Sequence, residues 1–288
     1  MPPLLLLFAT WSPSPAGLAL AVVLSAAYGI GAWRGGVGPG RAVVFYALGI
    51  GSLVLVTCGF LQAFGPELRW AYALKSVLLL LVVPLLLGLG KPLAAVRAAL
   101  GPGARRRLRS LGASRAVRVV TSPLAAPLMT LFALSVFLTP FSALLRRNEV
   151  LDGAAVVVLT LLGLAFVIPV LEDEDPSRAG RVMGVQILFV FIELLVDAIP
   201  GIALRLNPHV LDHAAAFGPH LAWFPTPLRD QQLAGDILWF LAEAADLPLL
   251  VLLLVRFQRS DRREAQSFDD MSAEEYRALT EAHLRRGR

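Results

Sequence analysis

Residues 153–171 read GAAVVVLTLLGLAFVIPVL, a stretch in which no side chain carries a charge. A helix needs about 20 apolar residues to cross the hydrocarbon core of a bilayer, and this stretch has that length. It is continuous, whereas a strand of an outer-membrane barrel alternates apolar and polar residues over about ten positions. Because a helix satisfies its own backbone hydrogen bonds in lipid, the stretch predicts a transmembrane helix.

Six further stretches of the same kind accompany it. The whole chain of 288 residues is 57% hydrophobic and 16% charged, which leaves too little polar surface for a soluble protein of this size. We therefore expect an all-α polytopic membrane protein with one seven-helix transmembrane domain over residues 1–258 and a cytoplasmic polar tail over 259–288. The predicted spans are residues 16–33, 42–64, 70–90, 123–145, 153–171, 182–204 and 237–255.

The distribution of Lys and Arg predicts the orientation of these spans. With the N-terminus outside the cell, the inner loops and the tail hold 20 of the 26 basic residues, and the outer loops hold five. Cytoplasmic loops carry the excess of basic residues, so we predict a multi-pass protein of the cell membrane with an outside N-terminus and a cytoplasmic C-terminus. The first 15 residues lack a basic n-region, so we expect them to be retained rather than cleaved as a signal peptide.

Several other classes of protein can be set aside. The basic stretch at 104–118, ARRRLRSLGASRAVR, lies between spans and has no interleaved aromatic residues. It is therefore typical of an anchor on anionic lipid, and we expect no nucleic-acid partner. One cysteine, Cys58, excludes an intrachain disulfide and a thiolate metal cage. No P-loop, GxSxG or HExxH motif is present, so we expect no enzyme. In the tail, Ser272 and Glu275 have capping-box spacing and predict a short helix.

Six ionisable residues lie within or at the edges of the predicted spans. A charge near the centre of the bilayer costs at least about 2.5–3.5 kcal/mol, so such groups usually face the bundle interior and have partners. The directions of the third, sixth and seventh spans place all six in the outer half of the membrane. We predict that they line one polar cavity open to the exterior, with the lysine as counter-charge. The alternative is that they are separate polar contacts between helices. The six are Lys75, Glu193, Asp197, Asp236, Glu243 and Asp246.

Five stretches, in order along the chain, are similar to one known family. They are RAVVFYALG (41–49), VVPLLLGLGKPL (82–93), SPLAAPLMTLFAL (122–134), GLAFVIPVL (163–171) and DQQLAG (230–235). Over roughly residues 10–265 the sequence resembles the multi-spanning CtaG-type cytochrome c oxidase assembly factors. The resemblance implies seven spans, a lipid bilayer and oxidase subunits as partners, and a role in the maturation of a haem-copper oxidase at the outer face. It also implies an outer-face motif made of Asp230, Gln231, Gln232 and Gly235.

The resemblance implies intramembrane histidines suited to copper, and here the sequence departs from the family. The third span of the family tends to read AH-x-x-QH, and this chain has AYALKS at 71–76. The fifth tends to begin with H-x-x-EH, and this chain has DGAAV at 152–156. Imidazole and thioether suit copper, whereas carboxylates suit harder ions. We therefore do not expect the spans to bind copper, and His209 and His213 in the outer loop remain the candidate metal ligands.

A second function fits the same residues. Carboxylates in membrane helices are typical of proton relays, so a proton-coupled or ion transporter is the alternative to an assembly factor. No inverted repeat is visible in the sequence, which counts against a transporter. Solute flux into proteoliposomes would favour the transporter, and co-purification with oxidase subunits would favour the assembly factor.

Overall fold

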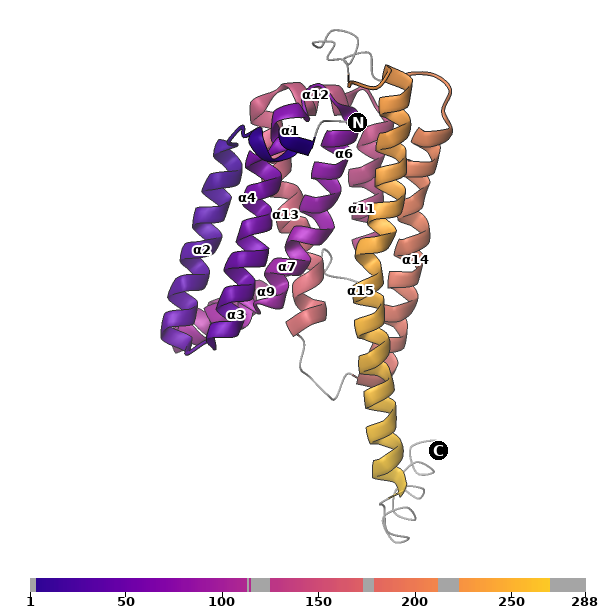
Figure 1. The fold of residues 1–288 in the computed structure, drawn as a ribbon. Coiled ribbons are helices and arrows are strands. Elements are labelled where there is room, and N and C mark those ends of the chain that lie inside the picture. Colours follow the sequence, from indigo (N-terminus) through magenta and orange to yellow (C-terminus); the bar gives the residue numbers. More distant parts are fainter. Residues whose placement is uncertain (1–3, 113, 115–124, 173–178, 212–222, 270–288) are drawn as a thin grey trace.

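The structure is a computed structural model that describes residues 4–112, 114, 125–172, 179–211 and 223–269, and every regular element in these ranges is a helix. Figure 1 shows long helices side by side, with short helices across both ends of the bundle. Within the described residues, four helices are long and apolar enough to cross a membrane, or five if one bent pair counts as a single span. The prediction of an all-α membrane protein is confirmed. Seven crossings remain a prediction.

The first three predicted spans correspond to long helical segments, two of which contain a π-helical turn. The first begins after Ser14, whose side chain accepts a hydrogen bond from the Gly17 N–H, and ends at Gly36 with φ 63°. This left-handed φ favours glycine, so Gly36 is a natural helix end. The elements are α2 (Pro15–Gly35), then α3 (Pro39–Val43), η1 (Val44–Ile50), α4 (Gly51–Cys58) and α5 (Phe60–Phe64), then α6 (Arg69–Val77), η2 (Leu78–Val82) and α7 (Val83–Leu89).

The prediction of one continuous helix over 123–145 is wrong. Helix α11 (Ala125–Ser135) continues into the 3-10 turn η3 (Val136–Leu138), and α12 (Phe141–Arg147) then leaves at an angle of 87°. Pro140 lies at the bend, where it can neither donate a backbone hydrogen bond nor continue the preceding helix. Helix α12 lies across the end of the bundle that also carries α1 (Leu4–Ala9), at the top of Figure 1.

The last three predicted spans correspond to α13 (Glu149–Glu172), α14 (Ala179–Leu206) and α15 (Pro227–Asp269). Helix α15 runs without interruption across the predicted domain boundary at 258/259 and extends past the other helices at the bottom of Figure 1. The short tail helix predicted from Ser272 lies outside the described residues.

The third predicted span is the centre of the fold. Its residues Leu79 and Leu87 belong to a core cluster with α2, α4 and α13, and its residues Tyr72 and Leu80 belong to a second cluster with α11, α14 and α15. It is also the most buried of the four candidate spans. A polar side chain on this segment therefore meets the protein interior on both sides, which makes it the natural place for a buried site.

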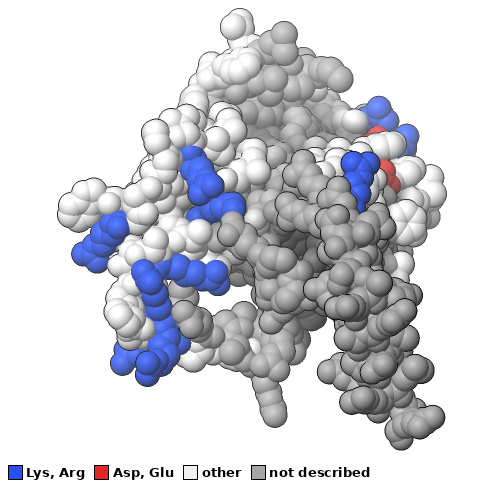
Figure 2. Space-filling view, turned by 90° about the horizontal axis from the view of Figure 1, so that it is seen from below, with Lys and Arg blue, Asp and Glu red and all other residues white. Residues whose placement is uncertain are grey.

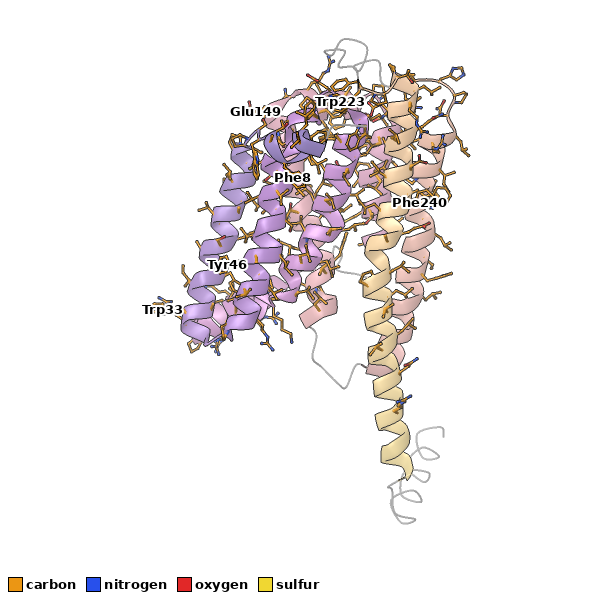
Figure 3. All side chains as sticks on the ribbon, viewed as in Figure 1. Phe8, Trp33, Tyr46, Glu149, Trp223 and Phe240 are labelled. Atoms are coloured by element: carbon orange, nitrogen blue, oxygen red, sulfur yellow. The ribbon has the colours of Figure 1, made fainter. Side chains whose placement is uncertain are left out.

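The two ends of the bundle differ in their basic side chains, whereas tryptophan is found near both. The chain begins at the upper end of Figure 1 and ends at the lower end. Seen from below, Lys and Arg gather mainly on one side of the lower face (Figure 2). At the upper end, Arg69 and Arg146 are only 2% exposed, so two of the five basic residues assigned to outer loops do not face solvent. Figure 3 shows Trp33 pointing outward near the lower end and Trp223 at the upper end, as expected of aromatic residues at the two membrane interfaces.

Candidate functional site

Lys75 lies in a closed ring of hydrogen bonds near the upper end of the bundle. Its Nζ donates to Asp152 Oδ1 at 2.5 Å and to Gln62 Oε1 at 2.6 Å. Gln62 Nε2 in turn donates to Asp152 Oδ2 at 3.0 Å. The three residues, which we call the Lys75 triad, come from α5, α6 and α13. The triad therefore ties α13 to the consecutive helices α5 and α6.

The triad is a buried ion pair with its polar atoms matched. The side chains of Lys75 and Asp152 are 3% and 8% exposed. The Tyr72 ring lies beside the ammonium, with its centroid 5.5 Å from Nζ, which is within the range of a cation–π contact. Removing two charges from water is costly, and their attraction offsets this cost only when the geometry is good and the remaining polar atoms are bonded. Both carboxylate oxygens and both amide atoms of Gln62 meet that condition here.

The observed partners of Lys75 differ from those we expected. We predicted that it would be the counter-charge of acids in the sixth and seventh spans, but its carboxylate partner is Asp152 in the fifth. Helix α13 begins at Glu149, so Asp152 lies within its first turn and at the level of Lys75. We had begun the fifth span at residue 153, one position too late to include it. An acid at the edge of a span, at the depth of an unpaired lysine, was the signal that could have found Asp152.

The other predicted cavity residues that the structure describes have partners of their own. Asp236 Oδ1 lies 2.8 Å from Arg205 Nε, and both side chains are about one-third exposed. Glu243 Oε1 accepts a hydrogen bond from Trp239 Nε1, one helical turn away, at 2.5 Å. The side chains of Glu193, Asp197 and Asp246 lie outside the described residues. A cavity shared by all six thus stays a prediction.

Asp230, the first residue of the outer-face motif, caps another helix. Its two carboxylate oxygens accept hydrogen bonds from the backbone N–H groups of Arg69, at 2.8 Å, and Trp70, at 2.9 Å. These are the first two residues of α6, where backbone N–H groups have no partner within the helix and a negative charge is favourable. Asp230 precedes the span predicted at 237–255. Burial raises the pKa of its carboxyl above the ordinary value, and the two N–H donors oppose that rise.

Gln231 is a fully buried junction between helices. Its Nε2 donates to the carbonyl oxygens of Asn207, at 3.3 Å, and His209, at 3.0 Å, just after the end of α14. Its Oε1 accepts from the Leu211 N–H and from Arg69 Nη1, both at 2.9 Å. The Gln231 side chain therefore provides hydrogen-bond partners for the backbone that follows α14. It also connects this backbone to Arg69 at the start of α6. Gln232, by contrast, is partly exposed.

Arg69 extends this network to the broken span. Besides Gln231, its guanidinium donates to the carbonyl oxygen of Phe137, immediately before the bend at Pro140. Non-helical backbone at membrane depth needs such partners within the protein. We had counted Arg69 as an ordinary outer-loop charge. The sequence shows that Arg69 directly precedes an apolar span. It does not show that the side chain lies against the buried Gln231 of the outer-face motif.

The last residue of the outer-face motif, Gly235, is where two helices cross. A Cβ atom at Gly235 would lie 2.7 Å from both the Arg205 nitrogen and the Gly201 oxygen of α14. A Cβ at Gly201 would in turn lie 2.8 Å from the Gly235 oxygen. These distances are shorter than real Cβ contacts, so glycine is required for the close approach of α14 and α15. Small residues at such crossings are typical of membrane helix pairs.

One of the two candidate metal ligands in the outer loop, His209, lies within the described residues. His209 is exposed, and the described hydrogen bonds of this residue involve its backbone, through the Asn207 side chain and Gln231. His213 lies outside the described residues. Within the described part of the chain, no group of three or more His, Cys, Asp or Glu side chains is placed to hold a metal ion.

The geometry can now be set beside known proteins. The sequence profile of the cytochrome c oxidase caa3 assembly factors (Caa3_CtaG) matches residues 23–260. The chain belongs to this family. The match covers the Lys75 triad, the outer-face motif and most of the described helices, and the resemblance to the family that the sequence indicated is confirmed.

Two curated relatives are the uncharacterized proteins Mb0105 of Mycobacterium bovis and MT0111 of Mycobacterium tuberculosis. Each is 26% identical to this chain over 272 residues. The similar region covers 91% of this chain but only 40% of each relative, so the chain spans about 40% of the length of the curated relatives it matches. No solved structure matches.

Proposed function

We propose that this chain assists the assembly of a haem-copper cytochrome c oxidase at the outer face of the cell membrane, in the predicted orientation with its N-terminus outside. The observation that carries the proposal is the family match over residues 23–260. In this role the chain is an assembly factor rather than an enzyme. Its partners are the lipid bilayer and one or more oxidase subunits.

The network at the upper end of the bundle supports an action at that end. Asp230, Gln231 and Arg69 connect the start of α6, the end of α14 and the break in the fourth span through buried hydrogen bonds. Such bonds fix the relative positions of the helix ends before a partner arrives, which lowers the entropy cost of binding. We propose that a maturing oxidase subunit meets this end, with the predicted polar cavity beneath it.

We further propose that the chain does not hold copper between its third and fifth spans. The family resemblance implies histidines there, and this chain has Tyr72, Ser76, Asp152 and Val156 at those positions, with Lys75 of the triad beside Ser76. A protonated amine carries no lone pair for a metal and repels a cation. The carboxylate and amide oxygens beside it suit hard ions rather than copper. If copper passes through this protein as cargo, His209 and His213 remain the candidate ligands.

A deletion strain tests the assembly role. Loss of the chain should lower oxidase activity in isolated membranes and the amount of assembled oxidase subunits, and the wild-type gene should restore both. A fully active oxidase in the deletion strain would contradict the proposal. The copper clause has a separate test, the copper content of the purified chain. We expect less than one copper per chain, and tight stoichiometric copper that survives His209→Ala/His213→Ala would refute the clause.

One observation favours the alternative function. The fourth span is broken by 87° between Leu128–Leu138 and Phe141–Arg147, and transporters often bind substrates at discontinuous helices. Proteoliposomes that contain the purified chain would test this. Proton-coupled uptake of a solute or ion, absent from empty liposomes, would favour a carrier. An assembly factor should give none.

A further inference from the structure

The lower end of the bundle carries a rigid cluster of arginines. Helix α8 (Pro92–Ala99) and helix α9 (Pro102–Gly112) follow the third span at the lower end of the bundle. Six exposed arginines from this corner and from the neighbouring ends of α2 and α3 make up what we call the basic platform (Figure 2). They are Arg34, Arg41, Arg97, Arg105, Arg106 and Arg107.

Acidic residues are nearly absent from this part of the sequence. Between residues 34 and 148 the only acid is Glu67, which precedes α6 at the upper end of the bundle. The charges of the basic platform therefore have no carboxylate neighbour from the same stretch of chain. They are therefore open to an anion from outside this stretch.

Helix α8 is held firmly against α2. A Cβ atom at Gly31 would lie 2.8 Å from the backbone carbon of Ala95, and one at Gly35 would lie 2.6 Å from the Ala98 Cβ. Ala95 itself is only 2% exposed. The two helices thus touch through small residues, and the backbone that carries Arg97 is fixed to the bundle.

Arg105 fixes the corner between α8 and α9. Its Nε donates to the Arg97 carbonyl oxygen at 2.8 Å, and its Nη2 donates to the Ala98 carbonyl oxygen at 3.0 Å. These bonds satisfy carbonyl oxygens at the end of α8 and hold the Arg105 guanidinium against that helix end. The bias that orients a membrane protein requires only basic residues in the loop and no fixed geometry. A clamped corner indicates a second use of the same charges.

We propose that the basic platform binds the phosphate headgroups of anionic lipids of the adjacent leaflet. Basic residues at a membrane surface attract anionic lipid, and arginine matches phosphate with a planar pair of donors. Seen from below, the charges lie over the lower end of the bundle, where the headgroups of that leaflet are expected (Figure 2). This binding is independent of the proposed assembly function.

The test is a titration of phosphatidylglycerol into the purified full chain in phosphatidylcholine nanodiscs or mixed micelles, with the thermal unfolding midpoint as readout. Phosphatidylglycerol should raise the midpoint of the wild type, and high salt should reduce the rise. Arg106→Gln/Arg107→Gln should need about 30-fold more phosphatidylglycerol for half the effect, at about a factor of five per arginine. The matched control is Arg147→Gln/Arg229→Gln, which removes two exposed arginines from the other end of the bundle and should behave as the wild type.

A charge-preserving variant tests the geometry. Arg105→Lys keeps the charge but cannot make both bonds to α8, so it should bind phosphatidylglycerol about fivefold more weakly. Wild-type affinity in this variant, or equal losses in the two double variants, would overturn the proposal in favour of non-specific charge. A full rise with inorganic phosphate in phosphatidylcholine alone would overturn the lipid assignment.

The acidic stretch at 172–175 is the competing anion within the chain. If phosphatidylglycerol stabilises the protein only after Asp173→Asn/Glu174→Gln/Asp175→Asn, the platform belongs to that segment, and the lipid proposal is wrong. If the wild type responds without these changes, the competing assignment is excluded.

Discussion

Breaking the Lys75 triad should cost a large part of the stability of the bundle. Asp152→Asn removes the counter-charge of a lysine whose side chain is 3% exposed. Leaving one partner of a buried ion pair unpaired costs about 3–5 kcal/mol. Loss of the proton from the lysine limits this cost, because neutralising an ordinary lysine at neutral pH costs about 4–5 kcal/mol and burial lowers that figure. Lys75→Met strands the carboxylate in the same way.

The double variant should recover most of this loss. In Lys75→Met/Asp152→Asn both charges are gone, and the new amide at position 152 can form two reciprocal hydrogen bonds with Gln62, which already faces it at 3.0 Å. Replacing a buried ion pair by neutral groups of similar size is often close to neutral for stability. The coupling free energy between the two positions should therefore be about 3 kcal/mol or more.

A double-mutant cycle on the purified protein measures this coupling from equilibrium unfolding in detergent. The matched control is a cycle between Lys75→Met and Asp236→Asn, because Asp236 pairs with Arg205 rather than with the lysine. Independent positions should couple by less than about 0.5 kcal/mol. A coupling below about 0.5 kcal/mol between Lys75 and Asp152 would refute the triad. A large coupling between Lys75 and Asp236 would also refute it and would favour the predicted cavity shared by the six ionisable residues.

Three further predictions test the outer-face motif and the topology. Gln231→Leu should lower the free energy of unfolding by about 2–4 kcal/mol, because it leaves several buried polar groups without partners. The control Gln232→Leu should change it by less than about 1 kcal/mol, and thermal unfolding of both variants measures the difference. Gly235→Ala should destabilise the protein by more than about 1 kcal/mol, because its Cβ would meet α14 backbone, while Gly38→Ala, with nothing within 4 Å, should be harmless; equal effects would contradict the tight crossing. A reporter fused after Arg259 should read cytoplasmic, and an exterior signal there would contradict seven spans with an outside N-terminus.

Much of the architecture could be read from apolar runs alone. A helix that crosses lipid needs about 20 apolar residues, so the apolar stretches predicted where the long helices lie. They did not predict the helix limits, since α15 runs from Pro227 to Asp269 and the predicted span was 237–255. The fourth span was the exception. It carries no charged side chain, and hydropathy does not report the direction of a helix, so only the structure showed the bend at Pro140.

The candidate site divides in the same way. That Lys75 needs a partner follows from the cost of a buried charge, which any sequence reading can apply. Which carboxylate supplies it does not follow, because pairing depends on rotation and depth of separate helices. By sequence alone, five acids were equally available as partners of Lys75: Glu193, Asp197, Asp236, Glu243 and Asp246. The observed partner is Asp152, which lies just outside the predicted fifth span.

The sequence by itself determined that this protein lies in a membrane, that it is all-helical and which family it belongs to. These properties depend on residue types and on their order along one chain. The tertiary structure alone decided what the motif residues do. Asp230 caps α6, Gln231 closes the end of α14, and Gly235 admits the crossing of two helices. Hydrogen bonds and close packing act over about 3–4 Å, and the residues they join here are up to 162 positions apart. No local pattern records such distances, so only the packed bundle reveals these partners.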